Sequence, residues 1–280
     1  MTQTQDGAAP IGPAGVPRRV TARATWLLAP NPGPMTFDGT NSWVLHEPGT
    51  RGSVIVDPGP DDPGHVSALV ALALEQGGRV DAILLTHGHP DHSAGVRETA
   101  RRTGAPVLGA SSRWCDQVIG GGRLDLAGLR VDVVPTPGHS SDSLSFHLPD
   151  DESMLTGDTV LGRSAPAILD PDGRVDQTIS SLSLIKDLLA GGEPLILPSH
   201  GPLVTDPRGV LAFALTARES RLNQVEEAVR DGHETVSAIA DRLYGPFDER
   251  IRRMIEATVR AHLRYLQDRR RLSRPVEIDG

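Results

Sequence analysis

Residues 86–92 read Thr-His-Gly-His-Pro-Asp-His, the most informative stretch of the sequence. It follows the apolar run of residues 82–85, which predicts a short buried strand. Four side chains of a type that binds metals therefore stand within six positions, directly after a strand. Such a cluster is typical of a metal site, whereas a lone loop histidine is ordinarily a surface or capping residue.

The spacing within this stretch predicts two metal positions. His87 and His89 are two residues apart, so in an extended segment their imidazoles project to the same side and can share one ion. Asp91 and His92 follow at once and offer an oxygen and a nitrogen to a second ion. Zinc takes histidine and carboxylate ligands where no thiolate is offered, so zinc is the expected metal.

Three further loops each place one metal-binding side chain directly after an apolar run. His139 follows residues 131–134, Asp158 follows residues 154–155, and His200 follows residues 195–197. A Gly-Asp-Thr sequence by itself is usually a turn. Open α/β sheets, however, concentrate their chemistry at the carboxyl ends of strands, so these loops favour one shared site.

Composition excludes several classes of protein. The chain has 280 residues, 38% of them hydrophobic, with a net charge of −8. One cysteine, Cys115, excludes an internal disulfide framework and a cysteine-based zinc site. There is no run of 18 apolar residues and no basic start followed by an apolar segment, so we expect a cytoplasmic protein without a membrane partner.

The chain divides into three parts by pattern. Residues 1–19 are small, polar and rich in Pro and Gly, which predicts a disordered tail. Strands and helices mix over residues 20–231, which predicts a catalytic domain of the α/β or α+β class. Residues 232–280 predict a small helical module. Its segment 248–274 carries nine arginines and four acids, which fits either an RNA-guiding patch or a helical cap with solvated arginines.

These motifs, in this order, resemble the metallo-β-lactamase superfamily over most of residues 20–205. The resemblance rests on Asp57-Pro58-Gly59, the stretch 86–92, His139, Asp158 and His200. It implies a four-layer αββα sandwich with two metals at one edge. It also implies the ligand assignment: His87, His89 and His139 for the first metal, Asp91, His92 and His200 for the second, and Asp158 bridging both. Asp57 would support the site without binding metal.

A closer resemblance, to the β-lactamase-like protein 2 family, rests on residues 31–34, 39–41 and 136–140 and on the helical tail. The apolar residues of this tail fall at helical spacing, which resembles a small winged-helix-like module. That family includes an endoribonuclease acting on single-stranded RNA, and related proteins act as thioesterases. Ser199 departs from the pattern, because the family commonly has glycine at this position.

The expected chemistry is hydrolysis by a hydroxide bridging two zinc ions, since two nearby ions lower the pKa of a shared water. Manganese or iron would also fit these ligands. Asp91 and Asp158 are the expected catalytic carboxylates, and no general acid is evident. The expected substrate is a small thioester, lactone or related ester. Single-stranded RNA is the alternative, and a non-catalytic metal-binding scaffold is the second alternative. The sequence does not fix the oligomeric state.

Overall fold

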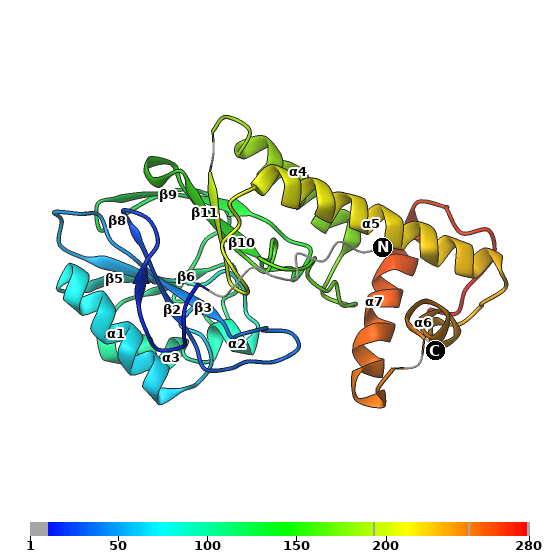
Figure 1. The fold of residues 1–280 in the computed structure, drawn as a ribbon, viewed down its shortest axis with the longest axis horizontal. Helices are drawn as coiled ribbons and strands as arrows, with labels where there is room; N and C mark the ends of the chain where they lie inside the picture. Colours follow the sequence, from blue (N-terminus) through cyan, green and yellow to red (C-terminus); the bar gives the residue numbers. More distant parts are fainter. Residues whose placement is uncertain (1–10, 193, 246, 279–280) are drawn as a thin grey trace.

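The computed structural model describes residues 11–192, 194–245 and 247–278. Two β-sheets pack face to face, and helices cover the outer face of each sheet (Figure 1). This is the four-layer αββα arrangement that the sequence resemblance implied, so the predicted fold class is confirmed. In the described part of the chain, no helix combines the length and the apolar character needed to cross a bilayer.

The first sheet has the strand order β1-β2-β3-β4-β5-β6-β7. Strands β1 to β4 pair antiparallel, and β4 to β7 pair parallel. Its strands are β1 (Arg18–Arg19), β2 (Ala24–Leu28), β3 (Asn41–Leu45), β4 (Ser53–Val56), β5 (Val80–Leu84), β6 (Val107–Gly109) and β7 (Gln117–Val118). Helices α1 (Pro63–Gly77) and α3 (Val96–Thr103) cover its outer face (Figure 1).

The second sheet has the order β12-β11-β10-β9-β8, antiparallel except for the parallel pair β11 and β12. Its strands are β8 (Gly122–Leu126), β9 (Leu129–Pro135), β10 (Leu144–Leu148), β11 (Ser153–Gly157) and β12 (Leu195–Pro198). A 3-10 turn, η1 (Pro149–Asp151), joins β10 to β11. Helices α4 (Val175–Leu188) and α5 (Pro207–Arg230) cover its outer face.

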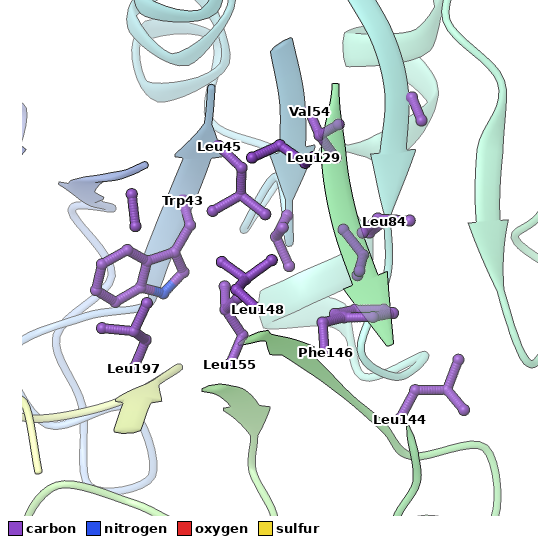
Figure 2. Packing of buried hydrophobic residues seen from close by; sticks show 14 of the residues in the cluster. Trp43, Leu45, Val54, Leu84, Leu129, Leu144, Phe146, Leu148, Leu155 and Leu197 are labelled. Atoms are coloured by element: carbon purple, nitrogen blue, oxygen red, sulfur yellow. The ribbon is translucent and has the colours of Figure 1, made fainter. Parts of the chain in front are cut away.

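The main core lies between the two sheets (Figure 2). Trp43 and Leu45 from the first sheet meet Phe146 and Leu155 from the second, and each is at most 1% exposed. Their burial follows from the apolar strand patterns, because removing such side chains from water is the dominant favourable term in folding. This core holds the sheets together and so fixes the relative positions of the loops at their edges.

Helix termini carry the residues that helix ends require. The Asp62 side chain accepts a hydrogen bond from the backbone of His65 at the start of α1, and Gly78 ends this helix in the left-handed conformation. Residues 92–102 predict one helix, and the structure has a short α2 (Pro90–Ser93) before α3. Proline at the first position of a helix loses no intrahelical hydrogen bond.

The C-terminal region contains α6 (Val236–Tyr244) and α7 (Glu249–Asp268), which lie beside the C-terminal part of the long α5 (Figure 1). Residues 250–261 and 262–271 each predict a short helix, and the structure joins them in one continuous α7. Among the described residues of this region, the one β feature is a bridge between Thr235 and Glu277, so the wing of a winged helix is not seen there. Buried side chains of α6 and α7 share a core with those of α5.

Part of the predicted tail lies against the first sheet. Arg18 and Arg19 form β1, which pairs with β2, and Ile11 is 7% exposed in the main core. The sequence of this segment is small and polar, but one apolar side chain at residue 11 is enough to pack. Residues 1–10 of the predicted tail lie outside the described residues. The boundary at Gly232 stays a prediction.

Candidate metal centre

Strand ends bring the predicted site residues together. Parallel strands β4 and β5 end next to each other, and they are followed by Asp57 and by the stretch 86–92. In the second sheet, β9, β11 and β12 run in one direction and are followed by His139, Asp158 and His200. Backbone hydrogen bonds from Leu144 to Thr86 and from Asn41 to Ser199 link the two sheets at this edge.

One group of three histidines converges on a single point. Nδ1 of His89 lies 3.0 Å from Nε2 of His87 and 3.0 Å from Nε2 of His139. His87 and His139 are buried, and His89 is half-buried. These three nitrogens are close enough together to hold one metal ion. They are the residues that the resemblance assigned to the first metal.

A second group forms beside the first. Nε2 of His200 lies 3.2 Å from Oδ2 of Asp91, and Nε2 of His92 lies 3.4 Å from the same oxygen. These three side chains can also hold a metal ion. The two groups adjoin through His87 and His92, whose ring centroids are 4.1 Å apart.

Asp158 lies between the two groups and faces each with a different oxygen. Its Oδ2 lies 3.5 Å from Nε2 of His139, in the first group. Its Oδ1 lies 3.4 Å from Nε2 of His200 and 3.6 Å from Nε2 of His92, in the second group. This geometry suits a carboxylate that bridges two ions. All seven predicted ligands therefore lie in one cluster.

Hydrogen bonds behind the cluster fix the tautomers of its histidines. Nδ1 of His139 lies 3.0 Å from the carbonyl of Ala167, and Nδ1 of His200 lies 3.1 Å from the carbonyl of Gly39. A carbonyl only accepts, so Nδ1 donates in both rings and Nε2 keeps its lone pair. Such outer hydrogen bonds orient metal-binding histidines.

Asp57 anchors the part of the cluster that comes from the first sheet. Its carboxylate accepts hydrogen bonds from the backbone and hydroxyl of Thr86, from Nδ1 of His92 and from the hydroxyl of Ser199. Because the Thr86 hydroxyl gives its only proton to Asp57, Nδ1 of His87, 3.1 Å from that hydroxyl, donates to it. Asp57 holds a φ of 49°, a conformation that non-glycine residues seldom adopt away from functional sites.

Charge within the cluster shifts several pKa values. Burial lowers the pKa of His92, but the carboxylates of Asp158, Asp91 and Asp57 outweigh it and raise this pKa well above its usual range. Burial raises the pKa of Asp158, yet the surrounding histidines bring it below its usual range. Burial is the main cause that lowers the pKa of His87. The carboxylates thus make the second group attractive to a cation.

The donor set fits metal ions better than it fits hydrogen bonding. Nε2 of His92, Nε2 of His200 and Oδ1 of Asp158 are buried without a hydrogen-bond partner among the described residues. A buried polar atom without a partner costs free energy. Several lone pairs facing one another call for a cation, and two divalent ions on imidazole and carboxylate ligands would satisfy them.

Several contributors to the site carry no sequence signal. The carbonyls of Gly39 and Ala167 act through the backbone, so residue type does not reveal them. Ser199 was noted only as a departure from the family pattern, whereas its hydroxyl donates to Asp57 over 3.1 Å. Thr86 stands inside the quoted stretch but is not of a metal-binding type. Its hydroxyl could have been suspected from its place between a strand and His87.

Two cavities flank the loop that follows Asp158. One has a volume of about 370 Å³ and includes Phe213 in its wall. The other, of about 350 Å³, lies between this loop, α5 and α7. Both volumes lie within the range of small-molecule sites. Residues 164–166 line both cavities.

Comparison with solved structures supports the fold. A beta-lactamase domain protein from Burkholderia ambifaria superposes with a TM-score of 0.79 at 19% identity, covering 94% of this chain and 91% of that one. A metallo-beta-lactamase family protein from Thermus thermophilus gives a TM-score of 0.70 at 24% identity, covering 88% and 93%. At these identities the likeness concerns the fold alone.

Curated relatives carry lactamase-like and thioesterase names. A lactamase-like protein of Pestalotiopsis microspora is 29% identical over 76% of this chain, and the match spans 65% of that protein, less than two thirds of its length. An atrochrysone carboxyl ACP thioesterase of Aspergillus chevalieri is 26% identical over 83% of this chain and 76% of its own length. These names do not point specifically to β-lactamase-like protein 2, so the closer resemblance stays a prediction.

A family model settles the wider relationship. The model of the metallo-beta-lactamase superfamily matches residues 35–200, the range that contains every residue of the cluster described above. The two-sheet fold agrees with this match. The chain therefore belongs to the metallo-beta-lactamase superfamily, as its histidine and aspartate motifs predicted.

Proposed function

We propose that this chain is a dinuclear metal-dependent hydrolase that cleaves a thioester or a related small carbonyl ester. The observation that carries the proposal is the place of Asp158 between two three-residue groups, with one oxygen toward each. In this proposal His87, His89 and His139 hold one ion, Asp91, His92 and His200 hold the other, and Asp158 bridges them. Zinc is the proposed metal, and manganese or iron would accept the same ligands.

When bound, two divalent ions would polarise the substrate carbonyl and make a water nucleophilic at neutral pH. Side chains and backbone carbonyls of this chain position the ligands. Asp57 and the carbonyls of Gly39 and Ala167 hold the imidazoles in fixed orientations. Asp91 is half-buried, so its carboxylate is partly accessible from solvent. Asp91 and Asp158 are therefore the proposed catalytic carboxylates.

The thioester is preferred because of the relatives. Proteins named as ACP thioesterases match most of this chain at 26–28% identity. This supports a small acyl substrate. It does not exclude RNA, the alternative substrate of the sequence prediction.

Several arginines of the C-terminal region are already paired with carboxylates. Arg252 pairs with Glu249, and Arg264 pairs with Asp170. Arg271 pairs with two glutamates of α5. Guanidinium groups already paired with carboxylates are less available for phosphates. RNA cleavage and localisation in the cytoplasm both stay predictions.

The test is hydrolysis of S-butyryl-N-acetylcysteamine by zinc-loaded protein, followed through the released thiol. Asp158→Ala, purified identically, is the variant, and Asp187→Ala, an exposed change on α4, is the matched control. We expect turnover in the wild type and the control and none in Asp158→Ala. Bound zinc without turnover of thioesters or of single-stranded RNA would overturn the proposal and favour a metal-binding scaffold.

A further inference from the structure

The cavity of about 350 Å³ shares its walls with the segments that orient the metal-site histidines. Ala167 lines it and accepts the hydrogen bond from His139. Phe37 also lines it, two residues before Gly39, whose carbonyl accepts from His200. The wall of the cavity is therefore in direct hydrogen-bond contact with a histidine of the metal centre, through Ala167.

Two arginines of α5 line this cavity, and neither is paired with a carboxylate. Arg218 is 7% exposed, and its guanidinium donates to the carbonyl of Pro166. Arg221, one turn later, stacks on the ring of Tyr244 at 4.6 Å. Within the part of the chain that the structure describes, neither forms an ion pair, and no Asp or Glu lines the cavity. Elsewhere on this acidic chain, arginines regularly pair with acids.

A third polar side chain, His262, lines the same cavity and has a partner for only one of its ring nitrogens among the described residues. His262 is 1% exposed and lines the cavity, and its Nδ1 donates to the carbonyl of Thr258 over 2.7 Å. Its Nε2 has no hydrogen-bond partner among the described residues, and neither has Nε of Arg218. Burying a guanidinium without an anion is costly. Burial lowers the pKa of Arg218 to about 10, so the side chain is still charged at neutral pH.

We propose that Arg218 and Arg221 bind an oxyanion at the far end of the substrate. The anion is either a carboxylate on the acyl group or a phosphate on the arm that carries the thiol. Carboxylates and phosphates each offer two oxygens that a guanidinium group binds with two parallel hydrogen bonds. This inference rests on the proposed function, since it names the substrate class of the same site.

The test uses two matched pairs of thioesters with zinc-loaded full-length protein. S-glutaryl-N-acetylcysteamine and its methyl ester differ only by a carboxylate. S-butyryl-4′-phosphopantetheine and S-butyryl-pantetheine differ only by a phosphate. We expect the anionic member of one pair to have a KM lower by roughly ten- to hundredfold, the range for hydrogen bonds to charged groups. The pair that shows the preference identifies the source of the anion.

The variants are Arg221→Gln, at a half-buried position, and Arg218→Gln, at the buried one. Each is expected to bring the ratio of KM values within the preferred pair close to one. Arg230→Gln, an exposed change at the end of the same helix, is the matched control and is expected to keep the wild-type ratio. Because Arg221→Gln changes no buried core residue, the test does not depend on the folding of Arg218→Gln.

A binding measurement separates this inference from the proposed function. Thioether analogues of all four compounds cannot be hydrolysed, and calorimetry on chelator-treated protein excludes binding through a metal. A preference for the anionic analogue that Arg221→Gln removes would support the site even where no thioester is cleaved. No preference in either pair, or a preference that survives both arginine variants, would overturn the inference.

Discussion

Nδ1 of His92 lies 2.9 Å from Oδ2 of Asp57, and both side chains are at most 1% exposed. The same carboxylate oxygen accepts hydrogen bonds from Thr86 and Ser199. One buried carboxylate from the first sheet therefore connects the stretch 86–92 to the loop before His200 in the second sheet. Asp57 binds no metal in the proposed assignment, yet it holds the ligands of both groups in place.

Asp57→Asn is expected to weaken zinc binding by about ten- to hundredfold, the usual effect of losing an outer hydrogen-bond partner. The amide nitrogen that replaces one oxygen donates and cannot accept from His92. Asparagine tolerates the left-handed conformation at this position, so the backbone is expected to stay as it is. Zinc affinity would be measured by competition with a chromophoric chelator.

Asp61→Asn is the matched control for this change, since Asp61 is an exposed neighbour. It is expected to bind zinc as the wild type does. Equal zinc affinities of Asp57→Asn and the wild type would show that Asp57 does not position His92.

His89→Ala and Asp158→Ala are expected to differ in metal stoichiometry. His89 contacts only the first group, so its loss is expected to leave one zinc per chain, on Asp91, His92 and His200. Asp158 faces both groups, so its loss is expected to weaken the binding of both ions. Elemental analysis after dialysis at a fixed free zinc concentration measures this difference. The same stoichiometry in both variants would contradict a bridging role for Asp158.

The ligands could be predicted because each is a metal-binding residue directly after an apolar strand. His87, His89, Asp158 and the others needed no tertiary information beyond that rule. The layer order came through the resemblance, since strand patterns do not determine how sheets stack. The predicted ligands meet in one cluster.

The remaining features depend on tertiary contacts that sequence patterns do not encode. The residues of strand β8 (Gly122–Leu126) are largely exposed and begin with glycine, so they form no apolar pattern that predicts a strand. The continuous α7 was divided in two because the pattern gave no reason to join the segments. Nothing in the sequence distinguishes Arg218 and Arg221 from other helix arginines, and only the packing of α5 against the loop before Ala167 places them in a cavity wall.

Acid is expected to destabilise the fold through His262. Burial is the main cause that lowers its pKa from 6.5 to about 4 in the folded chain. Between these values the unfolded chain binds the proton more tightly, so the stability from this residue is complete above pH 6.5 and is lost as the pH falls toward 4. The loss amounts to about 3 kcal/mol at the low end of this window.

Urea unfolding at pH 4.5 and pH 7 measures this effect, and His262→Gln removes the titrating group. The difference in unfolding free energy between the two pH values is expected to shrink in this variant relative to the wild type. His233→Gln is the control, because His233 also bonds a helix carbonyl through Nδ1 but is less buried. If the unfolding free energy of His262→Gln changed between the two pH values as much as that of the wild type, other groups would be responsible for the acid sensitivity.

The helices α6 and α7 are expected to stabilise the whole chain as a cap. Leu263 of α7 and Leu222 of α5 are both fully buried in one shared core. Leu263→Ala would remove buried apolar contacts and leave a cavity, which typically costs about 2–5 kcal/mol. Ile251→Ala, on the same helix but 39% exposed, is the matched control and is expected to cost about 0.5 kcal/mol.

Urea denaturation measures both variants. If Leu263→Ala lowered the unfolding free energy no more than the control does, α7 would not be part of the cooperative core. The case for an independent, RNA-guiding module would then be stronger.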